Sequence, residues 1–428
     1  MELKPGYKQS EVGVIPEDWN IDSLASVTPR NAGNGIVDGP FGSNLKTIHY
    51  RKSGIPIITS GYVTEGRFVA DTYLYVDKEK FEQEKRSTVR PGDIVMAKIG
   101  ARCGASAILP EWHQIGILSG NAMKITVDTS RHSAFYVWQV LWNLYSTDRI
   151  EPLKTVGAQP AISMANLKKY KIAIPPLPEQ RAIAAALGDV DALIDALDRL
   201  IVKKRDLKQA AMQQLLTGQT RLPGFRGEWE VKRLGDVGDI TSAGVDKKSR
   251  PGEVPVRLVN YLDVYRKDFI FSDDLNHWVT APPHQVKRCT VQKGDVFFTP
   301  SSETRDDIGI SAVAMEYIPD ATYSYHVVRL RLRDEWDLRF RTYAFKTRAF
   351  LDQAEMLCDG SGTRYVISQG KFKSMTVKVP PLLEQTAIAA VLSDMDTEIA
   401  ALGARRDKTR ALKQGMMQEL LTGRTRLV

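Results

Sequence analysis

The sequence has 428 residues, of which 43% are hydrophobic and 26% charged, as in ordinary globular proteins. Lysine and arginine exceed aspartate and glutamate by 59 to 51, and the net charge of +8 favours an anionic partner such as nucleic acid. No stretch reaches the ~18 apolar residues of a membrane span, and the first residues lack the apolar core of a secretory signal. Cys103, Cys289 and Cys358 are odd in number and far apart, which excludes a disulfide framework and suits a reducing cytoplasm, the predicted location.

The first predicted body, residues 1–175, is mixed α/β and rich in short strands and turns. Residues 89–95, VRPGDIV, are predicted as a hairpin with a Gly-Asp turn. Residues 172–174 alternate as a half-buried strand, which the following prolines end. Three aromatic residues fall near helical spacing, which favours core packing over base stacking: Phe135, Trp138 and Tyr145.

A long helix is predicted in residues 176–222. Its apolar residues step by four and three, which is the a/d pattern of a coiled coil. This seam comprises Ile183, Leu187, Val190, Ile194, Leu197 and Ile201. Thr217-Gly218 supplies the C-terminal stop, with the glycine in the left-handed conformation.

The second half of the chain repeats the first. Glu179 and Glu384 open two matching segments, PEQRAIAAAL and LEQTAIAAVL, and the same offset of 205 residues (384 − 179) separates LLTGQTRL from LLTGRTRL. A second body is therefore predicted in residues 223–380 and a second long helix in residues 381–428. The second seam comprises Ile388, Leu392, Met395, Ile399 and Leu402. Other matched segments are 55–63 with 254–262, 89–95 with 291–297, and Phe135, Trp138 and Tyr145 with Phe340, Tyr343 and Phe350.

Both helices are acidic in their first half and basic in their second. An antiparallel pair lays acidic segments beside basic ones, whereas a parallel pair would place like charges together. We therefore predict an antiparallel coiled coil that separates two pseudo-twofold-related α/β domains, with each helix about 57 Å long. The alternative is that each helix packs on its own domain, although such a helix is longer than an ordinary domain is wide.

The matched segments enclose stretches that differ. Residues 31–54 have no counterpart in residues 241–255. Because loops carry function, a shared framework with dissimilar loops predicts one scaffold that recognises two different targets. Drift after duplication is the alternative.

Motifs of catalysis are missing from the sequence. It contains no Walker A, dinucleotide-binding, zincin, Gly-x-Ser-x-Gly or amino-methylase motif. The six histidines lack metal-ligand spacing. We therefore predict no catalytic residue, no metal site and no cofactor bound by this chain.

PPLPEQRAIAAAL, the repeated LLTGxTRL, DGPFGSNLK and PEDW resemble the specificity subunit of type I restriction-modification systems, and the resemblance covers the whole chain. It implies two target recognition domains, the first for the 5′ and the second for the 3′ half of a bipartite, asymmetric DNA site. It also implies a non-catalytic subunit whose paired helices bind two modification subunits, which methylate adenine, and which restriction subunits join. S-adenosylmethionine, ATP and Mg are then expected on those partner subunits.

The DNA-binding residues are predicted from side-chain chemistry in the variable loops, because Arg, Lys, Asn and Gln suit base edges and Lys and Arg suit phosphates. In the first body we predict Asn44, Lys46, Lys98, Arg102 and Gln159. In the second we predict Lys247, Lys248, Arg250, Arg305 and Arg364. For each of them an ordinary solvated side chain is the alternative.

Two other functions stay open. One is a stand-alone DNA-acting enzyme with an unrecognised site, and cleavage of plasmid by the purified chain with a divalent metal would identify it. The other is a coiled-coil assembly scaffold with no nucleic-acid role. Unchanged methylation after replacement of Arg102 and Arg364 by alanine would favour the scaffold.

Overall fold

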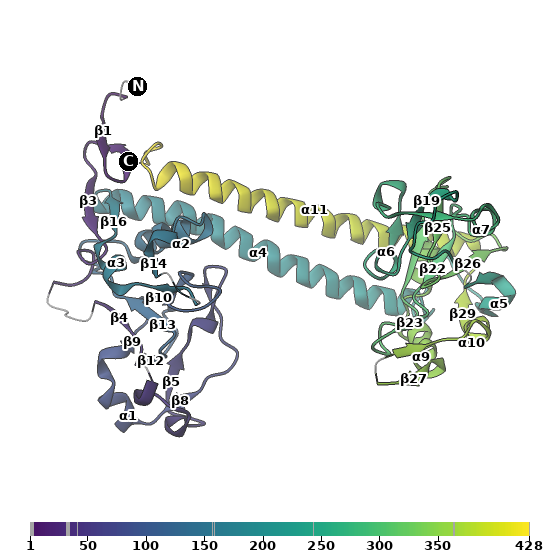
Figure 1. The fold of residues 1–428 in the computed structure, drawn as a ribbon, viewed down its shortest axis with the longest axis horizontal. Coiled ribbons are helices and arrows are strands. Elements are labelled where there is room, and N and C mark those ends of the chain that lie inside the picture. The colour runs from purple at the N-terminus through teal and green to yellow at the C-terminus, as the bar shows by residue number, and fades with distance from the viewer. Residues whose placement is uncertain are drawn as a thin grey trace. The chain divides into compact units, whose positions relative to one another are not determined.

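The computed structural model describes residues 4–30, 35–40, 42–155, 157, 159–242, 244–362 and 364–427, leaving aside the side chain of Ser43. The chain forms two compact units. Unit 1 comprises residues 1–196 and 405–428, so that it contains both ends of the chain, and unit 2 comprises residues 197–404. Figure 1 shows the ribbon of both units coloured along the chain.

Two four-stranded sheets form the globular part of unit 1, with the strand orders β11-β10-β13-β4 and β8-β5-β12-β9. Their bounds are β4 (Ile36–Asp38), β5 (Ile55–Ile58), β8 (Tyr75–Val76), β9 (Thr88–Val89), β10 (Ile94–Ala97), β11 (Ser106–Ile108), β12 (Gly116–Leu118) and β13 (Ala122–Ile125). Strand β10 is apolar throughout because its residues alternate between two cores: Ile94 and Met96 face the helices, while Val95 and Ala97 face the second sheet. Strands β5 and β12 run parallel.

Helices and strand pairs cover this framework. Helix α2 (Ala134–Ser146) begins at Ser133, whose hydroxyl accepts a hydrogen bond from the Tyr136 N–H. Its Trp138 is buried, which confirms the predicted core role. The remaining elements are β1 (Tyr7–Ser10) with β2 (Gly13–Pro16), β3 (Asn20–Ser23) with β16 (Lys171–Ile174), β6 (Val63–Thr64) with β7 (Arg67–Phe68), β14 (Lys154–Thr155) with β15 (Ala161–Ile162), α1 (Lys78–Gln83) and α3 (Met164–Lys169).

Unit 2 repeats this framework. Its sheets have the orders β18-β26-β22-β24-β20 and β21-β19-β25, and β19 and β25 again run parallel. The bounds are β18 (Gly238–Thr241), β19 (Val254–Val259), β20 (Phe269–Ile270), β21 (Trp278–Ala281), β22 (Val296–Phe298), β24 (Ser311–Ala314), β25 (Ala321–Tyr323) and β26 (Val328–Leu332). Around them lie β17 (Glu230–Arg233) with β29 (Thr376–Val379), β23 (Ser301–Ser302), β27 (Asp359–Ser361) and β28 (Arg364–Val366), and the helices α5 (Leu234–Val237), α6 (Tyr261–Tyr265), α7 (Pro283–Arg288), α8 (Phe340–Ala344), α9 (Arg348–Leu357) and α10 (Gln369–Ser374).

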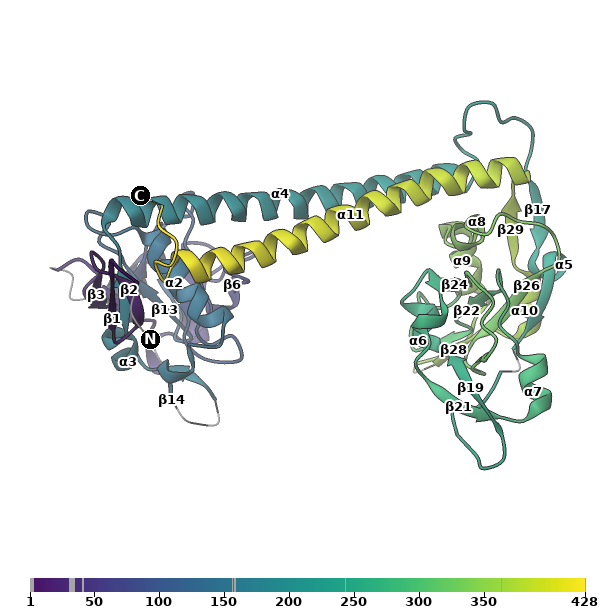
Figure 2. The ribbon, with the colours of Figure 1, turned by 90° about the horizontal axis from the view of Figure 1, so that it is seen from above.

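The two long helices are α4 (Leu177–Leu215) and α11 (Leu382–Leu420), of 39 residues each. Each runs from one unit into the other. In unit 1 the start of α4 packs against the end of α11, with Ile183 and Met417 in one core. In unit 2 the end of α4 packs against the start of α11, with Leu215 and Leu392 in one core. The mixed α/β fold with antiparallel helices, paired within each unit, is therefore confirmed (Figure 2).

Side chains at the predicted seam lie inside these helix pairs. Ile183, Leu187, Ile194, Leu197, Ile201, Ile388 and Leu392 are buried, and Val190, Met395, Ile399 and Leu402 are half-buried. Opposite charges meet across the pairs: Lys413 lies 2.8 Å from Asp191 in unit 1, and Lys204 lies 2.7 Å from Glu398 in unit 2. Beyond the first helix, Gly218 has a φ of 73°, as predicted for its stop, and Gly423 beyond the second helix has a φ of 71°.

A buried glutamate lies in the first turn of each long helix. In unit 1 the Glu179 carboxylate accepts hydrogen bonds from Trp19 Nε1 at 2.9 Å and from Arg426 Nε at 2.5 Å. This hydrogen bond to Glu179 and the one to Asp18 raise the pKa of Arg426 above its ordinary value. In unit 2 the equivalent carboxylate, Glu384, accepts from Trp229 Nε1 at 3.0 Å and from Arg221 Nε at 2.5 Å. We call each set an Arg–Glu–Trp cluster.

Replacing Glu179 by alanine is expected to lower the free energy of unfolding by about 2 kcal/mol, because the Trp19 N–H and the Arg426 guanidinium lose their buried acceptor. Urea unfolding followed by tryptophan fluorescence measures the change. Glu419→Ala is the control, since that glutamate is half exposed in a 3.6 Å ion pair with Arg424 and should change stability by less than about 0.5 kcal/mol. Equal losses in the two variants would show that the cluster has no special role.

Candidate nucleic-acid interface

Four chain segments meet at one corner of unit 1. They are the loop after β4, the loop between β10 and β11, the β12–β13 turn and the β14–β15 pair. The Lys98 N–H donates to the Asn121 carbonyl at 2.9 Å, and the Lys98 carbonyl accepts from the Ile162 N–H at 2.8 Å. The Gly100 N–H donates to the Pro160 carbonyl at 3.1 Å. The Gly39 N–H, at the start of the loop after β4, donates to the Ala122 carbonyl at 3.0 Å. These backbone bonds hold the four segments beside one another, and we call the four segments the unit 1 loop cluster.

Unit 2 builds the same cluster from equivalent segments. The Val245 N–H, after β18, donates to the Tyr323 carbonyl at 2.8 Å at the β25–β26 turn. The Ile367 N–H donates to the Pro300 carbonyl at 2.8 Å, and β23 pairs with β28. The bond from Ile367 occupies the position that the bond from Ile162 has in unit 1. Both loop clusters therefore rest on one backbone plan.

Two glycines show that the variable loops leave the framework at the same point. A Cβ on Gly39 would lie 2.0 Å from the Ser119 carbonyl oxygen, and a Cβ on Gly244 would lie 2.3 Å from the Ser324 carbonyl carbon. A side chain at either position would collide with the neighbouring turn. The loops around 31–54 and 241–255, which show no correspondence in sequence, thus begin equivalently. One shared glycine is too weak a signal to reveal this.

The predicted DNA-binding residues of unit 1 all belong to the segments of its loop cluster. They differ in exposure and in the contacts that their side chains make. Asn44, Lys46 and Gln159 are exposed. Lys98 is mostly covered and forms an ion pair of 2.5 Å with Asp38. Arg102 is exposed, but its Nη1 donates to the Val63 carbonyl at 3.1 Å and to Thr64 Oγ1 at 3.0 Å. The head groups of Lys98 and Arg102 therefore hold the loops in place.

The predicted residues of unit 2 are all exposed: Lys247, Lys248, Arg250, Arg305 and Arg364. They come from the loop after β18, the loop between β22 and β24, and strand β28. The Arg305 guanidinium lies 4.9 Å from the centre of the Tyr365 ring, which orients it by a cation–π contact. The structure thus brings cationic side chains from three separate chain segments to one loop cluster.

Sequence reasoning missed two residues at the β25–β26 turn. The exposed Tyr325 ring lies 4.0 Å from the His326 ring, centre to centre. Burial first, and then the charges of Lys247 and Arg364, lower the pKa of His326 below its ordinary value. A neutral imidazole both donates and accepts hydrogen bonds, which suits base edges more than phosphates. The sequence offers no signal for this pair, since an isolated histidine has no distinguishing spacing.

These loop clusters combine phosphate-binding cations with side chains that can read base edges. Within the described ranges, no group of three His, Cys, Asp or Glu side chains is placed to hold a metal ion. In the same part of the chain, no helix has the length and apolar character to cross a bilayer. One framework present twice with unlike cationic loops is suited to the recognition of two different nucleic-acid sequences.

Comparison with known proteins also indicates a protein that recognises DNA sequences. The model of the type I restriction modification DNA specificity domain matches residues 39–203 and 226–408. The chain is 23% identical to a putative type I restriction enzyme MjaX specificity subunit of Methanocaldococcus jannaschii, over 98% of this chain and 97% of that protein.

Two solved structures share the fold. One is a chain from work on complex assembly and conformational transition of the type I R-M system, with 17% identity, a TM-score of 0.59, and coverage of 96% of this chain and 99% of that one. The other is the type I S subunit of M. genitalium, with 14% identity, a TM-score of 0.53, and coverage of 98% of both chains. The chain belongs to the family of type I restriction-modification specificity subunits, as its sequence motifs predict.

Replacing Lys247 by alanine is expected to raise the pKa of His326 toward its ordinary value, because a neighbouring positive charge no longer opposes protonation. Arg364→Ala should shift it in the same direction, and Lys293→Ala, exposed outside the loop cluster, should leave it unchanged. An NMR titration of the imidazole measures all three. The depressed pKa also predicts that unit 2 loses stability as pH falls below the ordinary histidine value of 6.5, since the unfolded chain binds the proton first. A shift in the control alone would contradict the placement of His326.

Proposed function

We propose that this specificity subunit binds a bipartite, asymmetric DNA site, with one half-site for each loop cluster. The observation that carries the proposal is the repeated framework with equivalent but chemically unlike loops. Unit 1 presents Asn44, Lys46 and Gln159, whereas unit 2 presents five cations around Tyr325 and His326. Two identical loop clusters would favour a symmetric DNA site, whereas two unlike loop clusters favour a DNA site with two different half-sequences. By family resemblance, unit 1 takes the 5′ half-site and unit 2 the 3′ half-site, with an unread spacer of fixed length between them.

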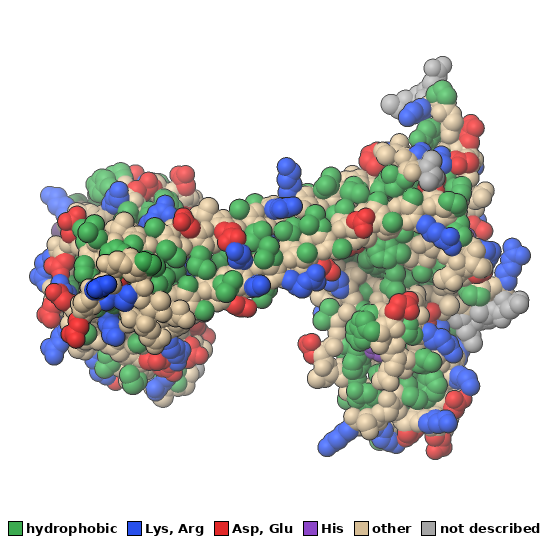
Figure 3. Space-filling view, turned by 180° about the vertical axis from the view of Figure 1, so that it is seen from behind, with side chains coloured by type: hydrophobic (Ala, Val, Ile, Leu, Met, Phe, Trp, Pro, Cys, Tyr) green, Lys and Arg blue, Asp and Glu red, His purple; other side chains and the backbone are tan. Residues whose placement is uncertain are grey.

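The same proposal gives the chain no catalysis of its own. It recruits two modification subunits that methylate adenine with S-adenosylmethionine, and restriction subunits that use ATP and Mg, in the cytoplasm. Uncovered apolar side chains on the long helices support a protein partner there (Figure 3). These residues include Leu193, Leu200, Val202, Leu207, Val391 and Leu412.

Methylated adenines mapped in a host genome, with and without this chain, test the function directly. We expect a two-part motif that disappears entirely when the chain is removed. A chimera in which residues 241–255 come from a relative should alter one half of the motif and leave the other half and the spacer unchanged. If one loop exchange alters both halves, the assignment of one half-site to each unit is wrong.

DNA binding in the presence of modification subunits tests the interface. Arg364→Ala is expected to weaken binding and to reduce the slope of log K against log salt by about one, as loss of a single phosphate contact predicts. Lys293→Ala serves as the matched control, because it removes one exposed charge elsewhere in unit 2. Fluorescence anisotropy over a series of salt concentrations measures both. A parallel loss in the control would indicate only a general effect of net charge.

The other two functions make different predictions. A stand-alone nuclease would cleave plasmid with a divalent metal and no partner. A pure scaffold would keep its methylation pattern after substitutions in the loop clusters. Lys46 and Arg364 are the better pair for that test, because Arg102 supports the loop beside Val63 and its removal would also disturb the fold.

A further inference from the structure

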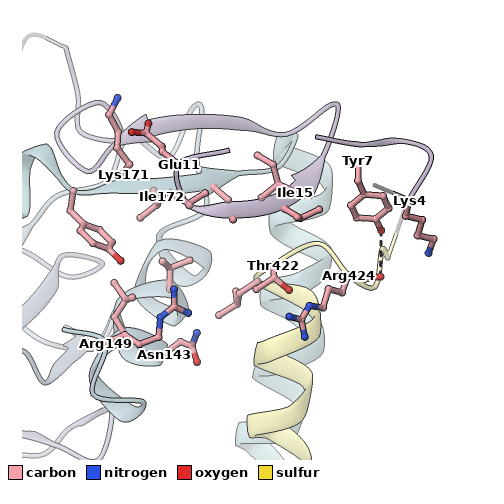
Figure 4. A pocket seen from close by; sticks show the side chains of 18 residues that line it. Lys4, Tyr7, Glu11, Ile15, Asn143, Arg149, Lys171, Ile172, Thr422 and Arg424 are labelled. Atoms are coloured by element: carbon pink, nitrogen blue, oxygen red, sulfur yellow. Dashed lines mark hydrogen bonds between the residues drawn. The ribbon is translucent and has the colours of Figure 1, made fainter. Parts of the chain in front are cut away.

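A pocket of about 870 Å³ lies in unit 1 away from the loop cluster. It is open on one side and is lined by the β1–β2 hairpin, strand β16, the end of α2 and the turn after α11. Figure 4 shows Arg149 and Asn143 on one side of it and Thr422 and Arg424 on another. The Tyr7 hydroxyl donates to the Gly423 carbonyl at 2.9 Å and so attaches the hairpin to the C-terminal turn. We call it the hairpin pocket.

The lining has an apolar floor and a cationic rim. The floor consists of Ile15, Val140, Leu144, Ile172 and Leu421. The rim carries the cations Lys4, Arg149, Lys171 and Arg424 against the single carboxylate of Glu11. In the described part of the chain, the side chains of Arg149 and Lys171 form no ion pair. This rim therefore has positive charge available for an anionic ligand.

A buried acceptor without a partner also lines the pocket. Asn143 is 8% exposed, and its Oδ1 has no hydrogen-bond partner among the described residues. A buried acceptor without a protein partner can take a hydrogen bond from a ligand or from water once the Asn143 side chain turns toward the pocket. A ligand of this pocket would thus supply a donor, an apolar group and a negative charge. A peptide segment has all three, in a main-chain N–H, an aliphatic side chain and a carboxylate.

The hairpin distinguishes unit 1 from unit 2. Pro5-Gly6-Tyr7 corresponds to Pro223-Gly224-Phe225, and Trp19 to Trp229. Between these points unit 1 has residues 8–18, with most of β1 and all of β2, whereas unit 2 has only residues 226–228 and no strand there. The hairpin is therefore an insertion in one copy of an otherwise shared framework.

We propose that the hairpin pocket binds an acidic peptide segment with an aliphatic side chain, contributed by one of the two modification subunits. This inference rests on the proposed function. It makes the two modification subunits inequivalent, because the segment engages unit 1 and finds no hairpin on unit 2. The carboxylate contacts Arg149 and Lys171, the aliphatic group covers the floor, and a peptide N–H donates to Asn143.

The test is the stepwise association of the full chain with its modification subunit, followed by native mass spectrometry and sedimentation. The variant carries Arg149→Glu and Lys171→Glu. Its control carries Lys168→Glu and Lys169→Glu, which reverse two exposed charges outside the pocket. We expect the variant to weaken one association step by about tenfold or more and to leave the other unchanged. The control should retain both steps.

Three outcomes would overturn the proposal. They are retention of both steps by the variant, an equal loss in the control, and loss of both steps together in the variant. If the unsubstituted chain binds no modification subunit, the proposed function fails as well. If it binds two with equal affinity and still reads a two-part DNA site, only the pocket proposal fails.

A second variant replaces residues 8–18 by the Arg-Gly-Glu of residues 226–228, which gives unit 1 the short connection of unit 2. Tyr7 and Trp19 are kept, and thermal unfolding verifies the fold. This second variant should also lose one step of association with the modification subunit and retain the other. In addition, a photoreactive benzoylphenylalanine at Val14, which lines the pocket, should crosslink to an acidic segment of the modification subunit. Crosslinking to DNA, or suppression of the crosslink by S-adenosylmethionine or ATP, would assign the pocket to another ligand and overturn the proposal.

Discussion

The buried carboxylates of Glu179 and Glu384 are the constraint on which each unit depends. A charge without access to water is strongly unfavourable unless hydrogen bonds and an opposite charge surround it. Each glutamate lies in the first turn of a long helix, where the macrodipole favours an anion, and its remaining partners come from distant segments. Trp19 leads into strand β3 of the framework, and Arg426 follows the end of the other helix. The carboxylate therefore fixes how sheet, helix start and helix end meet in unit 1.

The same cluster arises from two different chain connections. In unit 2, Arg221 and Trp229 lie eight residues apart on one continuous segment (229 − 221), and both bind Glu384. In unit 1, Arg426 and Trp19 lie near opposite ends of the chain and bind Glu179. The two clusters have the same geometry although the chain connects their residues differently. The chemistry of the three side chains therefore determines the cluster. A framework stabilised in this way leaves its loops free to differ, and the loops after Gly39 and Gly244 share little beyond their starting point.

Features that depend on the spacing of residues close together in the sequence could be predicted from it. Heptad spacing predicted the seams, charge order predicted antiparallel pairing, and the repeated Glu-Gln marked both helix starts. The partners of those glutamates were not predictable, since Trp19 is 160 residues and Arg426 is 247 residues away from Glu179. Side-chain type alone also could not separate Lys46, which is exposed, from Lys98, which Asp38 holds. His326 and its neighbour Tyr325 acquire a functional setting only because folding brings Lys247 and Arg364 to the same turn.

Duplication alone would yield two equivalent units, and the chain departs from equivalence at two separate places. The loop clusters differ in chemistry, with amides prominent in unit 1 and guanidinium groups in unit 2, so a DNA site with unlike halves fits them. The hairpin pocket differs on another part of unit 1, where Tyr7 contacts the turn after α11. The hairpin segment meets the Arg–Glu–Trp cluster of unit 1, since Asp18 accepts hydrogen bonds from Arg426. The side chains of the loop clusters take no part in that cluster, so the loops can vary without changing the hairpin. If the proposed function holds, DNA sequence preference can change through the loops while the surfaces proposed to bind protein partners stay the same.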